Sequence, residues 1–227
     1  MDYNDFRKFT DTASYDGAFK CGELAMANND LQGAIIDFSK ALEFSPNSYD
    51  ALHNKLLCLM KLNRYEAAIP ISEKICSLEN DFAPHFTTLG VCLAAINNVE
   101  KAEKAFAKSI SLDSTEYWVY FHRGELRFRG KQFYSAFYDF TKCIEIDEQF
   151  TGAFDYRGRI RGILLDHIGA INDFQKILSV KPDDGMTIFN LAVTYININE
   201  VEKGESLLRK AETLGIHQAT QILNQNR

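Results

Sequence analysis

Small and apolar residues recur along this chain at one fixed spacing. Six positions follow a single arithmetic series, and they hold, in order, Gly22, Leu56, Gly90, Gly124, Gly158 and Ala192. Twelve residues after each comes a small residue, in order Ala34, Ala68, Ala102, Ala136, Ala170 and Gly204. Four residues further on stand Phe38, Ser72, Phe106, Phe140, Phe174 and Leu208. A fixed period of roughly 20–50 residues is typical of a repeat protein, so we expect six copies of one unit.

The spacing inside each unit is helical. Ala34, Phe38 and Ala41 follow the i, i+4, i+7 pattern of the buried face of an amphipathic helix. The pattern predicts paired helices over residues 15–28 and 31–44, and then one further pair at each step of the series. Glycine inside a helix costs roughly 0.8–1 kcal/mol relative to alanine, so its recurrence needs a structural reason. We expect it to let the alanine of the second helix pack closely, while the phenylalanine fills the space between repeats.

The repeats divide the chain without insertions. The predicted boundaries are 15–48, 49–82, 83–116, 117–150, 151–184 and 185–218. Because the end of a solenoid must cover its last apolar face, the two flanking segments are expected to be caps. Residues 1–14 form an N-terminal lead with aromatic residues at Tyr3, Phe6 and Phe9. Residues 219–227 form a short C-terminal capping tail.

Repeat two is the least regular of the six. It has Leu56 where most repeats have glycine and Ser72 where most have phenylalanine. Pro70 falls inside its predicted second helix, where proline removes a backbone hydrogen bond and kinks the helix. We therefore expect the stack of repeats to bend or loosen at this point.

Repeats four and five carry the motif that identifies the family. In repeat four, Arg123–Gly124 is followed by Ala136 and then Asp139–Phe140, and repeat five has the same pattern at Arg157, Gly158, Ala170, Asp173 and Phe174. This pattern resembles the tetratricopeptide-repeat (TPR) family, over about nine-tenths of the chain. The resemblance implies an all-α, right-handed superhelical solenoid of antiparallel helix pairs. It also implies an inner groove that binds peptides or partner proteins, but not which partner.

Composition excludes several classes of protein. The 227 residues carry a net charge of −6, which argues against a non-specific nucleic-acid binder. No apolar run approaches the roughly 18 residues of a membrane span, and the first residues lack the apolar core of a signal peptide, so no membrane association is expected. The five cysteines are odd in number and scattered on apolar helix faces. They indicate reduced, buried thiols of a cytoplasmic protein, although a secreted chain with its signal removed would look the same.

No pattern of catalytic or cofactor-binding residues is present. The five histidines show no metal-ligand spacing with one another or with the cysteines, and phosphate-binding and nucleophile motifs are absent. The sequence therefore predicts a protein that is not an enzyme and has no cofactor. The basic segments around Arg123 and Arg157 are expected to pair with Asp139 and Asp173, which follow them at one constant offset. These pairings leave Arg127 and Arg161 without an evident partner.

The face of the first helices is the remaining candidate site. Mapped from the family, it is unusually apolar and aromatic: Phe19, Glu23, His53, Leu57, Met60, Val91, Trp118, Phe121, Glu125, Phe128, Arg129, Arg159 and Phe189. Exposed aromatic residues and methionine tend to mark partner-binding sites. Trp118, Phe121 and Phe128 are the expected anchors, and Glu125, Arg129 and Arg159 would set the register of the partner. The alternative is that some of these side chains pack between repeats.

The sequence thus predicts a scaffold or adaptor that binds an apolar or aromatic segment of a partner protein with mixed charge. Two alternatives remain open: a self-assembling homo-oligomer, and an RNA-binding helical repeat. TPR domains that hold the carboxylate tails of chaperones use a Lys/Asn pair at the two leading groove positions. Here the corresponding pairs are Phe19/Glu23, His53/Leu57, Thr87/Val91 and Phe121/Glu125. Such a tail is therefore not the expected ligand.

Overall fold

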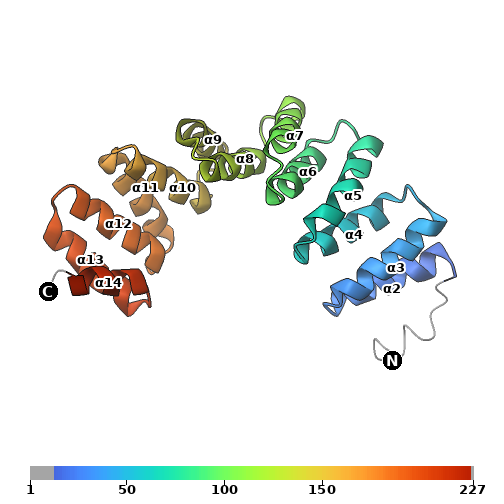
Figure 1. Ribbon diagram of the computed structural model, residues 1–227, viewed down its shortest axis with the longest axis horizontal. Coiled ribbons are helices and arrows are strands. Elements are labelled where there is room, and N and C mark those ends of the chain that lie inside the picture. The colour runs from blue at the N-terminus through green and yellow to red at the C-terminus, as the bar shows by residue number, and fades with distance from the viewer. Residues whose placement is uncertain (1–12, 226–227) are drawn as a thin grey trace. The chain divides into compact units, whose positions relative to one another are not determined.

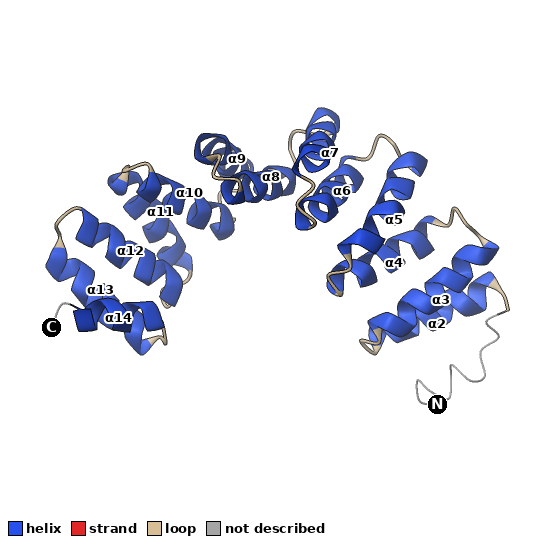
Figure 2. Ribbon diagram, viewed as in Figure 1, coloured by secondary structure: helices blue, strands red, loops and turns tan. Residues whose placement is uncertain are grey.

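The computed structural model describes residues 13–225, in which all regular structure is helical (Figures 1 and 2). The chain divides into two compact units, Met1–Ser114 and Thr115–Arg227. Unit 1 contains α2 (Tyr15–Ala27), α3 (Leu31–Phe44), α4 (Tyr49–Lys61), α5 (Tyr65–Leu78), α6 (Ala83–Ala95) and α7 (Val99–Leu112). Unit 2 contains α8 (Tyr117–Arg129), α9 (Phe133–Ile146), α10 (Thr151–Ile163), α11 (His167–Val180), α12 (Gly185–Asn197), α13 (Val201–Thr213) and α14 (His217–Gln225).

The predicted helix pairs are confirmed, and the predicted helix ends agree with the observed ones to within one residue. Inside each unit the helices pack in chain order, so that α2 packs on α3, α3 on α4, and so on. Consecutive helices alternate in direction, which gives stacked antiparallel pairs (Figure 1). The all-α fold expected from the repeat is therefore the observed one.

The turn inside every helix pair has the same backbone geometry. One residue in each turn has a positive φ between 55° and 66°, and these residues are Asn29, Asn63, Asn97, Lys131, Leu165 and Asn199. They occur once per repeat, always at the same repeat position. In the first turn the N–H of Asp30 donates to the carbonyl of Ala25 at 2.8 Å, which closes the helix end in a Schellman-type turn. Asparagine tolerates this left-handed conformation better than most residues, which explains its recurrence.

The recurring glycine makes room for an aromatic ring. A Cβ placed on Gly22, Gly90, Gly124 or Gly158 would lie 2.5–2.9 Å from a ring atom of the phenylalanine on the second helix of the same repeat. The expectation that the alanine of the second helix is the close neighbour was therefore wrong: the phenylalanine itself lies over the glycine. The rings of Phe38, Phe106, Phe140 and Phe174 are buried in this way.

Repeat two exchanges the large and the small residue of this pair. In repeat two, Leu56 comes from the first helix and Ser72 from the second, and both are buried. In repeat six the small residue, Ala192, stays on the first helix and the larger Leu208 on the second, and both are buried. Repeat six thus keeps the order of the other repeats, and repeat two reverses it.

Pro70 lies inside α5 without ending it. The helix runs from Tyr65 to Leu78 through the proline. Pro70 is exposed, so its ring points to solvent and displaces no core side chain. Glu66, whose carbonyl would have accepted the missing hydrogen bond, is also an exposed residue.

The structure describes the chain from residue 13 at the N-terminal end to residue 225 at the C-terminal end. Residues 1–12, including Tyr3, Phe6 and Phe9, lie outside the described residues. At the start of α2, the Ser14 hydroxyl accepts a hydrogen bond from the Gly17 N–H at 3.2 Å. At the other end, α14 places Ala219 and Leu223 in the buried cluster of unit 2 that includes Ile188, Ala192, Leu208 and Ala211.

Candidate functional site

In each unit the first helices of neighbouring repeats lie side by side. α2 contacts α4 directly in unit 1, and α10 contacts α12 in unit 2. Along the chain, these helices are separated by the second helix of a repeat, α3 or α11. The thirteen predicted site residues all lie on the first helices α2, α4, α6, α8, α10 and α12. Each unit therefore carries its own part of this face.

In unit 2 a continuous row of aromatic rings follows α8 and the start of α10. We call Trp118, Phe121, Phe128, Phe150 and Tyr156 the aromatic stripe. The Phe121 ring lies 6.0 Å from Trp118, 4.8 Å from Phe150 and 5.8 Å from Tyr156, measured between centroids. Tyr156 in turn lies 5.3 Å from Phe128. Most of these pairs meet edge to face, the geometry in which the ring quadrupoles attract.

The members of the aromatic stripe differ in how far they reach solvent. Trp118 is 41% exposed, whereas Phe121 and Phe128 are half-buried. Phe121 also packs on the buried Phe140, with ring centroids 5.9 Å apart. Of the three expected anchors, Trp118 therefore offers the most free surface. Phe121 and Phe128 also hold neighbouring repeats together, which is the alternative that the sequence leaves open for this face.

Glu125 lies beside the stripe and is held by two hydrogen bonds. The Tyr156 hydroxyl donates to its Oε1 at 3.0 Å, and His122 Nδ1 lies 3.0 Å from its Oε2. Burial, followed by the charge of Glu125 and the hydrogen bond to it, raises the pKa of Tyr156 to about 12. The Tyr156 proton is thus retained at physiological pH and keeps repeats four and five joined across the stripe.

Arg159 places its guanidinium over two aromatic rings of this face. Its guanidinium carbon lies 4.8 Å from the Phe128 centroid and 5.2 Å from the Tyr156 centroid, which is favourable cation–π geometry. Its Nη1 lies 3.4 Å from Asp155 Oδ2, as the i, i+4 spacing predicts. Burial raises the pKa of Asp155, and the neighbouring Arg159 acts against that rise.

A pocket of about 320 Å³ lies beside Arg159, between α10 and α12. It is lined by Phe128, Gly158, Arg159, Gly162, Ile163, Phe174, Phe189, Asn190, Val193, Thr194 and Asn197. Three predicted site residues, Phe128, Arg159 and Phe189, are brought together here. The walls are largely apolar, with one cation, Arg159, and two side-chain amides, Asn190 and Asn197.

Unit 1 has a smaller pocket of about 160 Å³ between α4 and α6. Its walls are Tyr49, His53, Leu56, Leu57, Met60, Ser72, Ile75, Phe82, Pro84, His85 and Thr88. Three predicted site residues, His53, Leu57 and Met60, are thereby brought together in unit 1. Four further predicted residues line neither pocket: Phe19 stacks on Tyr15, Val91 is half-buried, and Glu23 and Arg129 are exposed.

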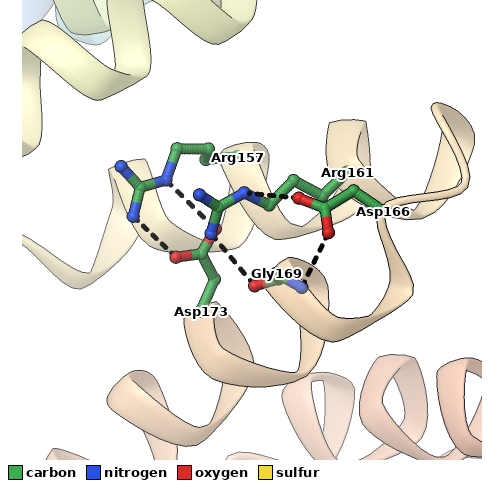
Figure 3. Close-up of polar contacts among 5 residues, drawn as sticks. All are labelled: Arg157, Arg161, Asp166, Gly169 and Asp173. Atoms are coloured by element: carbon green, nitrogen blue, oxygen red, sulfur yellow. Dashed lines mark hydrogen bonds and ion pairs between the residues drawn. The ribbon is translucent and has the colours of Figure 1, made fainter.

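Four arginines of repeats four and five are bound by aspartates within the protein: Arg123, Arg127, Arg157 and Arg161. Asp173 accepts two hydrogen bonds from Arg157, at 2.7 and 3.1 Å, and forms an ion pair with Arg161 at 2.8 Å (Figure 3). Arg161 also donates to the carbonyl of Gly169 at 3.0 Å and lies 3.4 Å from Asp166 (Figure 3). We call Arg157, Arg161 and Asp173 the arginine–aspartate cluster of repeat five.

Repeat four has an equivalent cluster. Asp139 accepts from Arg123 at 2.7 and 3.2 Å and from Arg127 at 2.9 Å. The predicted pairs of Arg123 with Asp139 and of Arg157 with Asp173 are confirmed, but the expectation that Arg127 and Arg161 have no partner was wrong. A buried carboxylate can accept from two guanidinium groups that are one helical turn apart. Arg157 and Arg161 are therefore engaged within their own repeat.

Several residues of the site were not predicted from the sequence. Tyr156 and Phe150 complete the aromatic stripe, and His85 and Phe82 line the unit 1 pocket. The sequence does carry a signal for Tyr156, because it occupies the same repeat position as His122 and Asn190. His122 and Tyr156 both bond Glu125, and Asn190 bonds Asp155 of the preceding repeat.

Within residues 13–225, no group of three or more histidine, cysteine, aspartate or glutamate side chains is arranged to hold a metal ion. The helices of the same residues are all too short or too polar to cross a bilayer. All five cysteines are buried and unpaired by disulfides.

Comparison with known proteins places this geometry in a family. A sequence model described as "Tetratricopeptide repeat" matches residues 49–82. The small glutamine-rich tetratricopeptide repeat-containing protein 2 of Mycosarcoma maydis is 25% identical over 92 residues, 40% of this chain and 26% of the relative. The aligned part thus spans about a quarter of that relative's length.

Two solved structures illustrate the likeness of fold. The type IV pilus biogenesis factor PilW superposes with a TM-score of 0.77, at 16% identity over 92% of this chain and 97% of that one. YrrB, described as a TPR protein with an unusual peptide-binding site, superposes with a TM-score of 0.68, at 20% identity over 83% of this chain and 97% of that one. Taken with the stacked helix pairs and the constant repeat period, these matches identify the chain as a tetratricopeptide-repeat protein.

Proposed function

We propose that the chain is a non-enzymatic scaffold that binds a segment of a partner protein along the face of its first helices. The observation that carries this proposal is the aromatic stripe of unit 2, which ends in the 41% exposed Trp118 and is flanked by the stacked Arg159. A tryptophan and an arginine on one face are the residue types that dominate binding energy in protein interfaces. YrrB shows that a protein of this fold can carry a peptide-binding site.

The chemistry of the face suggests the kind of segment it would bind. Its walls are aromatic and aliphatic, and the charged groups at its edge have both signs, Glu125 and Asp155 against Arg129 and Arg159. The proposed ligand is therefore an extended or helical segment with apolar or aromatic anchors and mixed charge. A chaperone carboxylate tail, a nucleic acid or a membrane surface does not match this surface.

The test is a capture experiment with two matched variants. The first is Trp118→Ala combined with Arg159→Ala, which removes exposed groups and leaves Phe121 and Phe128 in place. The second, Tyr134→Ala, removes an aromatic ring that is 79% exposed on α9, a second helix. Both variants are first checked for unchanged helicity by circular dichroism.

We expect a partner captured by the wild type and by Tyr134→Ala to be lost with the double variant. Binding that is equal for all three proteins would overturn the proposal and direct attention to the second helices or the ends. Recovery of further copies of the chain itself, with a mass in solution that rises with concentration, would favour self-assembly instead.

A further inference from the structure

The pocket of unit 1 occupies the place where other repeats hold a phenylalanine ring. In repeat four, the Phe140 ring lies between two aromatic side chains, 5.9 Å from Phe121 and stacked on Tyr156 at 4.8 Å with an interplanar angle of 7°. Phe121 belongs to the same repeat, and Tyr156 belongs to the first helix of the next. The ring thus fills the space between consecutive first helices.

The same three positions occur two repeats earlier with smaller or more polar residues. The positions of Phe121, Phe140 and Tyr156 correspond there to His53, Ser72 and Thr88. All three line the unit 1 pocket. Leu56, which replaces the glycine, packs in the core of unit 1 and leaves about 160 Å³ open beside it. The pocket is therefore lined by the counterparts of the residues that enclose the Phe140 ring, with the smaller Thr88 in place of Tyr156.

The polar groups on the pocket wall are largely engaged by the protein. His85 Nε2 lies 2.9 Å from Glu79 Oε2, and the Thr88 hydroxyl donates to the Pro84 carbonyl at 3.0 Å. The wall also contains a cluster of rings, in which Tyr49 lies 5.6 Å from His53 and 5.5 Å from His85. These ring faces and edges, with Leu56, Met60 and Ile75, form a surface that suits an aromatic, uncharged group.

We infer that this pocket binds one phenylalanine side chain supplied by the partner segment. The inference rests on the proposed function, because the ring that enters the pocket of unit 1 is supplied by a bound partner segment. A dry cavity of about 150 Å³ is large enough to bind benzene, so the volume here suits one phenyl ring. The ring enters the place that the protein's own phenylalanine fills in repeats one, three, four and five.

The exchange of residues suggests a variant that closes the pocket without unfolding the repeat. Leu56→Gly with Ser72→Phe restores the pair found in most repeats, so the protein's own ring should fill the site. Thr88→Tyr is a second variant, which narrows the pocket from α6 with the residue type present at Tyr156. If one of them fails to fold by circular dichroism, the other still tests the pocket.

The first probe is toluene, titrated into methyl-labelled wild-type protein and observed by NMR. We expect the methyl signals of Leu57, Met60 and Ile75 to shift with saturation, and the same signals to stay unchanged in Leu56→Gly/Ser72→Phe. An absence of shifts in the wild type, or equal shifts in both proteins, would overturn the pocket as a ring site.

The second probe is a set of twelve-residue peptides selected from a random library against the wild-type protein. We expect the selected peptides to share one phenylalanine, whose replacement by alanine weakens binding to the wild type at least tenfold. The same replacement should have little effect on binding to the closed variant. If peptides bind and lose affinity with Trp118→Ala, but their affinity is indifferent to pocket closure, the proposed function stands and the phenylalanine anchor is overturned.

Discussion

The ring of Phe174 lies directly over Gly158, at a distance that leaves no room for a side chain. A Cβ on Gly158 would stand 2.8 Å from Cε1 of that ring. Phe174 is 2% exposed, so its ring has little space into which it can move. This relationship, repeated in four of the six repeats, sets how closely the two helices of a pair approach.

We predict that Gly158→Ala destabilises the protein despite the better helix propensity of alanine. Overpacking a core by a methyl group typically costs about 1–3 kcal/mol, whereas the gain in propensity is about 1 kcal/mol. The measurement is the free energy of unfolding from urea denaturation. Gly162→Ala in the same helix is the matched control, since a Cβ there meets nothing within 4 Å. It should be neutral or stabilising, and an equal loss in both variants would contradict the explanation.

A second prediction concerns the turn residue Leu165. It has a φ of 65° and is 75% exposed, so it bears the strain of a left-handed residue while its side chain packs on little. The left-handed conformation costs an ordinary residue roughly 1–2 kcal/mol, and asparagine tolerates it better. Leu165→Asn should therefore raise the free energy of unfolding by about 0.5–1 kcal/mol.

The reciprocal change is the control for this turn. Asn97 has a φ of 60° at the same position of repeat three. Asn97→Leu should lower stability by a similar amount, measured in the same denaturation experiment. A loss of stability with Leu165→Asn would show that contacts of the leucine outweigh the backbone strain.

The positions of the helix pairs could be predicted from the sequence because they depend on local periodicity. The glycine and phenylalanine series locate the helix pairs to within one residue. The left-handed turns could have been predicted as well, since Asn29, Asn63, Asn97 and Asn199 follow the same period. Both signals lie in the repeat itself and need no knowledge of contacts between distant residues.

The parts of the site that were missed depend on contacts that a spacing rule does not describe. The pairing rule leaves Arg161 without a partner because it matches one arginine to one aspartate, whereas Asp173 accepts from two. Leu56 and Ser72 are recognisable as irregular, but the pocket beside them also needs His53 and Thr88 on two different first helices. A spacing rule applied within one repeat does not predict contacts between residues of two different repeats.

A third prediction concerns the cysteines. Burial raises the pKa of Cys76 and of Cys92 to about 11 and that of Cys143 to about 12. Because the thiolate is the reactive form, a raised pKa leaves very little of it at pH 8. We expect slow reaction of the folded protein with a disulfide reagent such as DTNB, and reaction of all five thiols once the protein is unfolded in guanidinium. A thiol that reacts rapidly with DTNB in the folded protein at pH 8 would contradict the raised pKa of these buried cysteines.

The last prediction is that the arginine–aspartate cluster of repeat five stabilises the fold through its aspartate. The Asp173 side chain is 3% exposed, and its two oxygens accept from Arg157 and Arg161, whose side chains are 13% and 21% exposed. Removing the aspartate leaves two guanidinium groups close together without their shared counter-charge, a change that costs about 3–5 kcal/mol for buried pairs. Asp173→Ala should therefore be among the most destabilising single substitutions in unit 2.

Removing one arginine should cost much less, because the other remains on the carboxylate. We expect Arg161→Met to lower the free energy of unfolding by clearly less than Asp173→Ala does, and the double variant to cost less than the sum of the two. Glu205→Ala is the control, since its pair with Arg209 is exposed and long, at 4.0 Å, and such pairs contribute roughly 0–1 kcal/mol. Urea denaturation of the four variants measures these differences. If Asp173→Ala were no more harmful than Glu205→Ala, the cluster would contribute specificity of packing rather than stability, because the guanidinium groups would then be solvated adequately without the aspartate.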